Sequence, residues 1–507
     1  MGRNSHNKII IKNTVALSLR MMLTMCVGIY ASRILLSNLG VVDYGVYNVV
    51  GGVIGLFSFL NVTLINGTQR YLNYYLGKND KEKISNIFST SVNVFIVLAL
   101  IIFALAESLG LWFVNYKLNI PSERLIAANI VYQFTIISAV INIISTPYNA
   151  LIIAFERMSI FALISIVQSL TMFVFAYVLP WLPWDRMVAY SILVCLLQIG
   201  IRGYYGYYCN MKFPEIHHSF IIDKALFKEM FSFSGWTLTG TFAYMTYNQG
   251  ILFLLNLSFG PIVNAAQSLA MQVNNSLNGF SGSFMMASKP RITKYYAEDD
   301  LTNMRALIFT SSKMSYLIMT LISMPFLICT EQILDIWLKE IPSYTKPLLQ
   351  IMLIITIWNT LSIPAVTGIH ATGLIKKFQI YESAVLLSIL PISFLAIRLY
   401  HDPIAAYIVM LLVMIVVQFI RLGYMNKLLG VNVRLYLTDI ILRLNVALMV
   451  SISVNVFINN FLPNDTLGFI ISLFIQEILT ICVFLSIGLN HHERNQLIGL
   501  IKSRIKI

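Results

Sequence analysis

The stretch Asn13-Thr-Val-Ala-Leu-Ser-Leu-Arg20, which continues as an apolar run to Ser37-Asn-Leu-Gly40, opens a hydrophobic hairpin. A second apolar run extends from Asp43 to Asn66, and the basic segment Arg70–Lys83 follows it. Each run is long enough to cross a hydrocarbon layer of about 30 Å, because a helix rises about 1.5 Å per residue. The hairpin therefore predicts two membrane-spanning helices, with an arginine inside the first and a positively charged loop after the second.

The composition extends this prediction to the whole chain. Of the 507 residues, 58% are hydrophobic and 11% are charged, which is too little charge for the surface of a soluble protein of this size. The runs are long and do not alternate as barrel strands do, so we expect helices, which satisfy their own backbone in lipid. The fold class is an all-α integral membrane protein with about fourteen transmembrane helices, at residues 12–37, 43–68, 84–110, 125–152, 158–180, 187–209, 230–256, 262–287, 305–331, 346–370, 377–399, 403–425, 440–461 and 466–489.

The charge distribution orients these helices. The formal net charge is +13, and about 26 of the 35 Lys and Arg lie in alternate segments that become cytoplasmic if the N-terminus is cytoplasmic. This bias is typical of the positive-inside rule, so the basic charge indicates membrane orientation and no nucleic-acid partner. We expect both termini to be cytoplasmic. The first apolar run lacks a small-residue cleavage site, so we expect an uncleaved first span.

The chain carries no pattern that is typical of an enzyme or of a metal site. It contains no phosphate-binding glycine loop, no GxSxG and no HExxH, and we expect no cofactor. The five cysteines are isolated, so neither a metal site nor a disulfide framework is predicted; they are Cys26, Cys195, Cys209, Cys329 and Cys482. The loops expected on the outer face are short, which argues against a polysaccharide polymerase or ligase.

An internal repeat divides the chain. The pattern Arg-x-x-x-Tyr-Tyr occurs at 70–75 and at 291–296, and the offset of 221 residues also aligns 87–91 with 308–312. Leu39-Gly40 aligns with Phe259-Gly260 after a slip of one residue. The alternative is that all hydrophobic hairpins look alike, but composition does not explain the matched motif. We predict two six-helix lobes related by a pseudo-two-fold axis, at 1–210 and 230–426, with a cytoplasmic linker at 211–229. Residues 427–507 form two appended helices and a basic tail.

Arg20, Arg33 and Lys313 lie within apolar runs, and each is a candidate site because charge at membrane depth is costly. Arg20 lies about 12 Å inside the first run, and Thr24 shares its helical stripe. We expect Arg20 to face an internal cavity; snorkelling to the inner headgroups is the alternative. Arg33 is off this stripe, and we expect it to snorkel outward. Lys313 is at a similar depth to Arg20 and has the same two interpretations.

Uncharged polar residues are concentrated in three of the predicted helices. In the second helix, Gly51 and Gly55 form a small-xxx-small pair that favours close packing of helices. The seventh and eighth helices are rich in amides and hydroxyls, which suit a hydroxyl-rich ligand; hydrogen bonds between helices are the alternative use. The predicted substrate-binding residues are Arg20, Thr24, Asn48, Asn248, Gln249, Gln267, Asn275 and Lys313.

Carboxylates are rare inside the predicted spans. Glu382 lies about a turn and a half into its helix, and Glu477 lies near the middle of the last helix. Either could accept a proton or pair with a cation, so both are predicted coupling residues. Prolines that permit helix bends lie in four spans, at Pro147, Pro325, Pro364 and Pro391.

Two segments near the N-terminus carry a resemblance to a known family. They are Ser32-Arg-Ile-Leu35 and Leu39-Gly-Val-Val-Asp-Tyr-Gly-Val-Tyr47. Together with the plan of six, six and two helices, they resemble the polysaccharide-biosynthesis flippases of O-antigen and capsule type, within the multidrug/oligosaccharidyl-lipid/polysaccharide superfamily.

The resemblance implies a two-lobed transporter in the bacterial inner membrane, which moves an undecaprenyl-diphosphate-linked oligosaccharide between leaflets by alternating access. It implies membrane lipids, a polysaccharide polymerase and a chain-length regulator as partners, and a cationic cavity to which Arg20 contributes. Arginine binds diphosphate through charge-assisted hydrogen bonds. Cation-coupled drug or metabolite efflux on the same fold is the alternative function. It requires a carboxylate facing the first lobe's cavity, and none lies deep in the first six helices.

Overall fold

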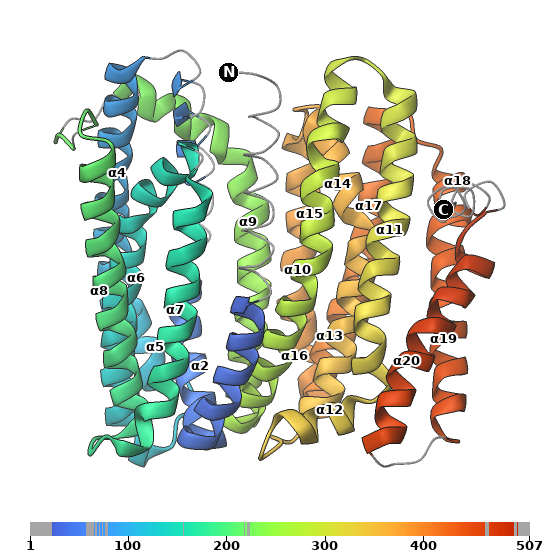
Figure 1. Ribbon diagram of the computed structural model, residues 1–507, viewed down its shortest axis with the longest axis horizontal. Coiled ribbons are helices and arrows are strands. Elements are labelled where there is room, and N and C mark those ends of the chain that lie inside the picture. Colours follow the sequence, from blue (N-terminus) through green and yellow to red (C-terminus); the bar gives the residue numbers. More distant parts are fainter. Residues whose placement is uncertain are drawn as a thin grey trace, which may run out of the picture. The chain divides into compact units, whose positions relative to one another are not determined.

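The computed structural model describes residues 23–56, 65, 68–69, 71–72, 75–76, 80–155, 157–216, 218–220, 224–461, 466–490 and 494. Every regular element within these ranges is helical, and the predicted all-α membrane fold is confirmed (Figure 1). The first described helix spans Leu23–Leu39. The later α-helices are α2 (Val41–Gly55), α4 (Lys81–Leu105), α5 (Leu111–Tyr116), α6 (Leu125–Ala154), α7 (Met158–Val178), α8 (Arg186–Lys212), α9 (Lys224–Phe259), α10 (Pro261–Ala297), α11 (Leu301–Ile328), α12 (Thr330–Trp337), α13 (Thr345–Thr360), α14 (Ser362–Ala371), α15 (Lys376–Leu387), α16 (Ile389–Tyr400), α17 (Ile404–Leu429), α18 (Val433–Tyr436), α19 (Arg443–Asn459) and α20 (Thr466–Val483).

Several of these helices are long and apolar enough to cross a membrane. Among the described residues, 9 helices meet this requirement, or up to 11 if each of two bent pairs forms one span. The amide-rich helices α9 and α10 are not among them. The count of fourteen spans therefore stays a prediction.

The helices form two compact units. Unit 1 comprises residues 1–269, 338–344 and 386–403, and unit 2 comprises 270–337, 345–385 and 404–507. Unit 1 therefore contains α9 and the start of α10 in addition to the six helices predicted for the first lobe. The predicted lobes, at 1–210 and 230–426, follow the sequence repeat instead, and their boundaries stay a prediction.

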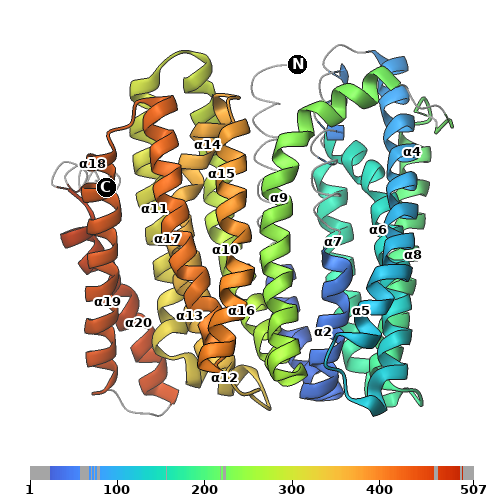
Figure 2. The ribbon, with the colours of Figure 1, turned by 180° about the vertical axis from the view of Figure 1, so that it is seen from behind.

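In unit 1, α6 packs against both α4 and α8, and the three run side by side in Figures 1 and 2. The buried side chains of Val46, Val50 and Tyr132 belong to one apolar core, to which Leu252 and Phe253 of α9 also contribute. In unit 2, α11 packs against α13, α14, α19 and α20. The appended helices are thus part of the core of unit 2.

Two glycines turn the chain between paired helices. Gly40 separates the helix Leu23–Leu39 from α2, and Gly260 separates α9 from α10, with φ angles of 80° and 79°. Each glycine amide donates to the carbonyl four residues earlier, at 2.8 Å in both turns. A side chain strains this left-handed conformation, so glycine is favoured at both positions. The aligned pairs Leu39-Gly40 and Phe259-Gly260 therefore share one local structure.

The helices that follow the two copies of the Arg-x-x-x-Tyr-Tyr motif begin with similar caps. Asp80 caps α4 by accepting from the Lys83 amide at 3.1 Å, and Asp300 caps α11 by accepting from the Asn303 amide at 3.0 Å. Helix α10 continues to Ala297, ten residues beyond the end of the apolar run 262–287. The Arg-x-x-x-Tyr-Tyr motif at 291–296 is therefore helical.

Proline breaks one span in unit 2, as expected. Helices α13 and α14 are bent by 40° at Leu361, three residues before Pro364, which cannot donate a backbone hydrogen bond. At this bend, the Leu361 carbonyl accepts from the Tyr436 hydroxyl at 2.8 Å and the Ser312 hydroxyl at 3.1 Å. Both hydroxyls are buried, so side chains from α18 and α11 satisfy the carbonyl inside the bundle.

Glycines on α2 allow close helix packing in unit 1, but Gly51 is not one of them. A Cβ at Gly45 would lie 1.9 Å from the Pro261 carbonyl oxygen, and one at Gly52 would lie 2.5 Å from Leu252. At Gly51 a Cβ would meet none of the described residues within 4 Å. Within this part of the chain, the predicted pair Gly51 and Gly55 is therefore wrong at Gly51.

The contrast between Gly45 and Gly51 can be tested with a matched pair of variants. Gly45→Ala forces α2 away from the α10 start, so we expect a lower melting temperature of the purified protein in detergent. Gly51→Ala has room for its methyl group and removes a flexible residue from a helix, so its melting temperature should equal or exceed that of the wild type. Equal melting of the two variants would contradict the packing described here.

Candidate functional site

The predicted substrate-binding residues are distributed over both units. Arg20 lies outside the described residues. Thr24, Asn48, Asn248, Gln249 and Gln267 belong to unit 1, whereas Asn275 and Lys313 belong to unit 2. The two coupling candidates, Glu382 and Glu477, also belong to unit 2.

Two of the predicted amides bond within their own helices. Asn48 donates to the Tyr44 carbonyl at 2.7 Å, and Asn248 donates to the Tyr244 carbonyl at 2.9 Å. Both bonds join residues four apart in one helix. Contact of either amide with a substrate therefore stays a prediction.

Gln249 brings two helices of unit 1 together. Its side chain lies over the glycines of α2: a Cβ at Gly52 would be 3.1 Å from its Oε1, and one at Gly55 would be 2.9 Å from its Nε2. The missing side chains at these glycines make room for the amide. We infer that Gly52 and Gly55 serve to admit a polar side chain of α9 as well as to let helices approach.

A chain of amides in unit 1 was not expected from the sequence. Asn256 donates to Asn264 Oδ1 at 2.7 Å and accepts from the Asn119 backbone amide at 2.7 Å. Asn264 donates in turn to the Leu252 carbonyl at 2.8 Å. These amides of the seventh and eighth predicted helices thus form hydrogen bonds between helices, which was the alternative use of such residues.

Gln267 differs from these bonded amides. Its side chain is only 1% exposed, yet its Oε1 has no hydrogen-bond partner among the described residues. A buried amide oxygen without a partner is costly. Gln267 is therefore the predicted residue of unit 1 with the clearest unused hydrogen-bonding capacity.

In unit 2, the predicted residues have contrasting surroundings. Asn275 is exposed on α10, whereas Lys313 on α11 is only 3% exposed. Glu382 is buried and forms an ion pair with Arg421 of α17 at 2.6 Å. The sequence did not indicate this pairing, because the two residues are 39 positions apart in different predicted helices.

Glu477 lies on α20, next to buried polar residues that bond this helix to α11 and α19. Its neighbour Gln476 is buried and donates to Cys329 Sγ at 3.1 Å and to Ser472 at 2.6 Å. Asn455 of α19 donates to Thr480 at 3.1 Å. Glu477 itself is half-buried. The polar residues that fix α20 to α11 and α19 are thus its uncharged neighbours.

A cluster at one end of unit 1 gives the Leu-Gly-x-x-Asp motif a structural role. The Arg124 guanidinium donates two parallel bonds to Asp43, at 2.7 and 2.6 Å, and a third to Asp185 at 2.6 Å. Burial tends to raise the pKa of Asp185, but the bonds from Arg124 and from the Val188 amide hold this pKa below its ordinary value. The cluster joins α2, the start of α6 and the start of α8.

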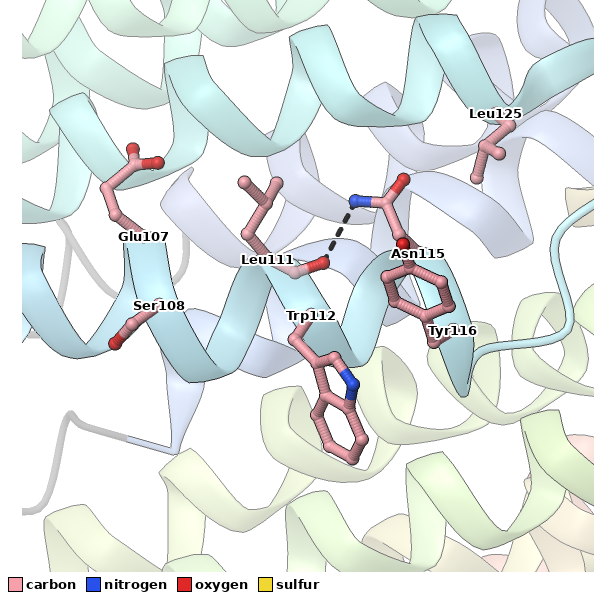
Figure 3. A pocket seen from close by; sticks show the side chains of 7 residues that line it. All are labelled: Glu107, Ser108, Leu111, Trp112, Asn115, Tyr116 and Leu125. Carbon is pink, nitrogen blue, oxygen red and sulfur yellow. Dashed lines mark hydrogen bonds between the residues drawn. The ribbon is translucent and has the colours of Figure 1, made fainter.

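A shallow groove of about 460 Å³ lies at the α4–α5 junction (Figure 3). Its lining residues are Glu107, Ser108, Leu111, Trp112, Asn115, Tyr116 and Leu125. The junction is a π-helical turn, Ala106–Gly110, whose Ala106 carbonyl accepts from the buried Tyr132 hydroxyl at 2.8 Å. Trp112 and Tyr116 are exposed, as expected for aromatic residues at a membrane interface.

The described residues contain no group of three or more His, Cys, Asp or Glu that could hold a metal ion. Cys26, Cys195, Cys209, Cys329 and Cys482 are free thiols. What the site offers within these ranges is amide and hydroxyl hydrogen bonding.

Solved structures with this fold are membrane transporters. The lipid II flippase MurJ in an inward closed conformation matches with a TM-score of 0.67 and 14% identity, over 93% of this chain and 98% of that chain. An outward-facing multidrug resistance MATE transporter of the MOP superfamily matches with a TM-score of 0.61 and 14% identity, over 82% and 95% of the two chains. The fold is that of MOP-superfamily transporters.

Comparisons of the sequence identify a family within this class of membrane transporters. A family model described as polysaccharide biosynthesis protein matches residues 10–296, which is more than half of the chain, and one described as MatE matches 238–395. The chain belongs to the polysaccharide biosynthesis protein family, and the resemblance to its flippases is confirmed. The uncharacterized membrane protein EpsK of Bacillus subtilis (strain 168) is 21% identical over 342 residues, and the match spans 65% of each of the two chains.

The cluster of Arg124 with Asp43 and Asp185 provides a test of the structural role of the Leu-Gly-x-x-Asp motif. Asp43→Asn removes the charge that Arg124 binds with two parallel bonds, and the side chains are only 20% and 26% exposed. We expect a loss of about 1–3 kcal/mol in stability, seen as a lower melting temperature in detergent.

Glu215→Gln is the matched control for this variant. It breaks the Lys81–Glu215 pair of the same unit, whose side chains are 68% and 62% exposed, and exposed pairs contribute little. If Asp43→Asn melted like Glu215→Gln, the cluster would have no stabilising role.

Proposed function

We propose that this transporter moves an undecaprenyl-diphosphate-linked oligosaccharide from the inner to the outer leaflet of the bacterial cytoplasmic membrane. The observation that carries the proposal is the match of the polysaccharide biosynthesis family to residues 10–296. The MurJ-like fold supports it, because the printed name of that neighbour is lipid II flippase. The proposal includes cytoplasmic termini and alternating access between two lobes.

The amides of α9 and α10 fit the headgroup of such a substrate. Sugars present many hydroxyls, each of which donates and accepts, and neutral amides pair with both without the desolvation cost of a charge. Gln267, whose Oε1 is buried and unpartnered among the described residues, is the strongest candidate of this set. Asn48, Asn248, Gln249 and Asn275 are the further amides of the proposal, together with Thr24.

Cations complete the proposal, since the diphosphate is the charged part of the substrate. Arg20 would bind it with bidentate, charge-assisted hydrogen bonds, and Lys313 is the second cation of the set. Glu477, half-buried on α20, is the proposed residue for coupling to a cation or proton. A polysaccharide polymerase and a chain-length regulator are the proposed protein partners.

A second candidate function is cation-coupled efflux of a drug or metabolite. The match of the MatE family model to residues 238–395 favours it. The structural likeness to multidrug transporters is at 14% identity, so it bears on the fold alone. The two functions differ in the fate of surface polysaccharide when the gene is deleted.

We therefore expect deletion of the gene to remove surface polysaccharide and to leave lipid-linked repeat units on the inner leaflet. The measurement is glycan analysis of the cell surface together with mass spectrometry of extracted polyprenyl-linked sugars. The wild-type gene supplied in trans is the control. An unchanged glycan profile in the deletion strain would reject the flippase proposal and favour efflux.

Arg20 is tested in the same strain. We expect Arg20→Ala to abolish export, because the diphosphate then loses its bidentate partner. Arg20→Lys should retain part of it, because a point charge replaces the bidentate guanidinium. Arg33→Ala is the matched control, since Arg33 is expected at the outer interface. Normal export by Arg20→Ala would reject its assigned role.

A further inference from the structure

The most deeply buried of the described ion pairs lies in unit 2 and joins α15 to α17. Arg421 Nε and Nη2 both contact Glu382 Oε1, at 2.7 and 2.6 Å. The two side chains are only 13% and 8% exposed. By contrast, the Glu331–Lys346 pair of the same unit is 68% and 48% exposed at a similar distance of 2.7 Å.

Neighbouring contacts place the pair inside a polar interface of three helices. One turn before Arg421, Gln418 accepts a hydrogen bond from Ser362 of α14. Near Glu382, Gln379 contacts His370 of α14 at 3.1 Å. Helices α14, α15 and α17 lie side by side in both views of the molecule (Figures 1 and 2).

An aromatic contact reinforces the same interface. Phe378 of α15 is fully buried, and its ring lies 5.5 Å from that of Tyr424 on α17, edge to face. Phe378 is one turn before Glu382, and Tyr424 is about one turn after Arg421. The ion pair and the ring pair therefore fix the same two helices at neighbouring turns.

The span that contains Glu382 is shared between the two units. Its first half, α15, belongs to unit 2 up to Val385, whereas residues 386–403, with α16, belong to unit 1. The helix is interrupted at Ser388, three residues before Pro391. Within unit 1, α16 packs tightly on α9, because a Cβ at Gly250 would lie 2.4 Å from Leu390. Each half of the span thus has its own anchor.

We propose that Glu382 and Arg421 form a permanent brace that fixes α15 to α17, and that Glu382 does not exchange a coupling ion. A coupling carboxylate must bind a cation or proton and release it in every cycle. The cation at Glu382 is the guanidinium of Arg421, which is covalently attached to α17 and cannot leave. Exchange of this partner for a free ion would leave the buried guanidinium uncompensated, and this cost opposes such a step.

The brace and the coupling role differ in what they require of the pair. A brace needs both residues matched, but it does not need charge, and buried pairs are often replaced by apolar residues without loss. A coupling carboxylate is needed whatever its partner. The double variant that removes both charges therefore separates the two roles, whereas either single variant leaves one buried charge uncompensated.

The experiment uses the full-length protein with Glu382→Gln, Arg421→Met and the double variant Glu382→Met/Arg421→Met. Melting in detergent and surface polysaccharide of the complemented deletion strain are both measured. We expect each single variant to melt lower and to lose export, and the double variant to recover both. Glu331→Gln, in the exposed pair, is the control and should match the wild type in both.

Two results would overturn the brace. One is a double variant that melts like the wild type but exports nothing, since Glu382 would then be required for more than packing. The other is a Glu382→Gln variant that melts like the wild type. The melting measurements need no substrate. They therefore test the structural role of the Glu382–Arg421 pair even if the proposed polysaccharide substrate is wrong.

Discussion

A polar group inside the hydrocarbon is costly unless it finds a partner within the protein, and this constraint determines how the helices of this chain are held. The Leu361 carbonyl, at the bend before Pro364, accepts from Tyr436 and Ser312. The same requirement pairs Glu382 with Arg421 and joins Cys329 to Gln476. In water each of these groups would be satisfied by solvent, and their positions would carry less structural information.

The polar contacts act together with close packing of backbone. In unit 1, the absence of side chains at Gly45 and Gly52 lets α2 approach the start of α10 and the end of α9. Association of helices in lipid gains little from burial of apolar surface, so such close approach and hydrogen bonding supply much of the specificity.

Because most of the buried amides described above are hydrogen-bonded, a buried amide without a partner is informative for function. Amides such as Asn256 and Asn264 bond one another and hold helices together. Gln267 is equally buried but keeps a free oxygen within the described part of the chain. In a transporter of the polysaccharide biosynthesis family, such amides are suited to sugar hydroxyls, because they donate and accept without carrying charge.

The sequence by itself determined the membrane class, the helical fold, the turn at Gly40 with its counterpart at Gly260, and the family. These follow from local properties: the length of apolar runs, the backbone freedom of glycine and a short contiguous motif. It did not indicate that Asp43 binds Arg124, which is 81 residues away, or that Glu382 is neutralised by Arg421. It also named Gly51 where Gly45 and Gly52 make the close contacts. Only the tertiary structure decided these points, because which face of a helix meets which neighbour depends on the packing of distant segments and not on spacing along the chain.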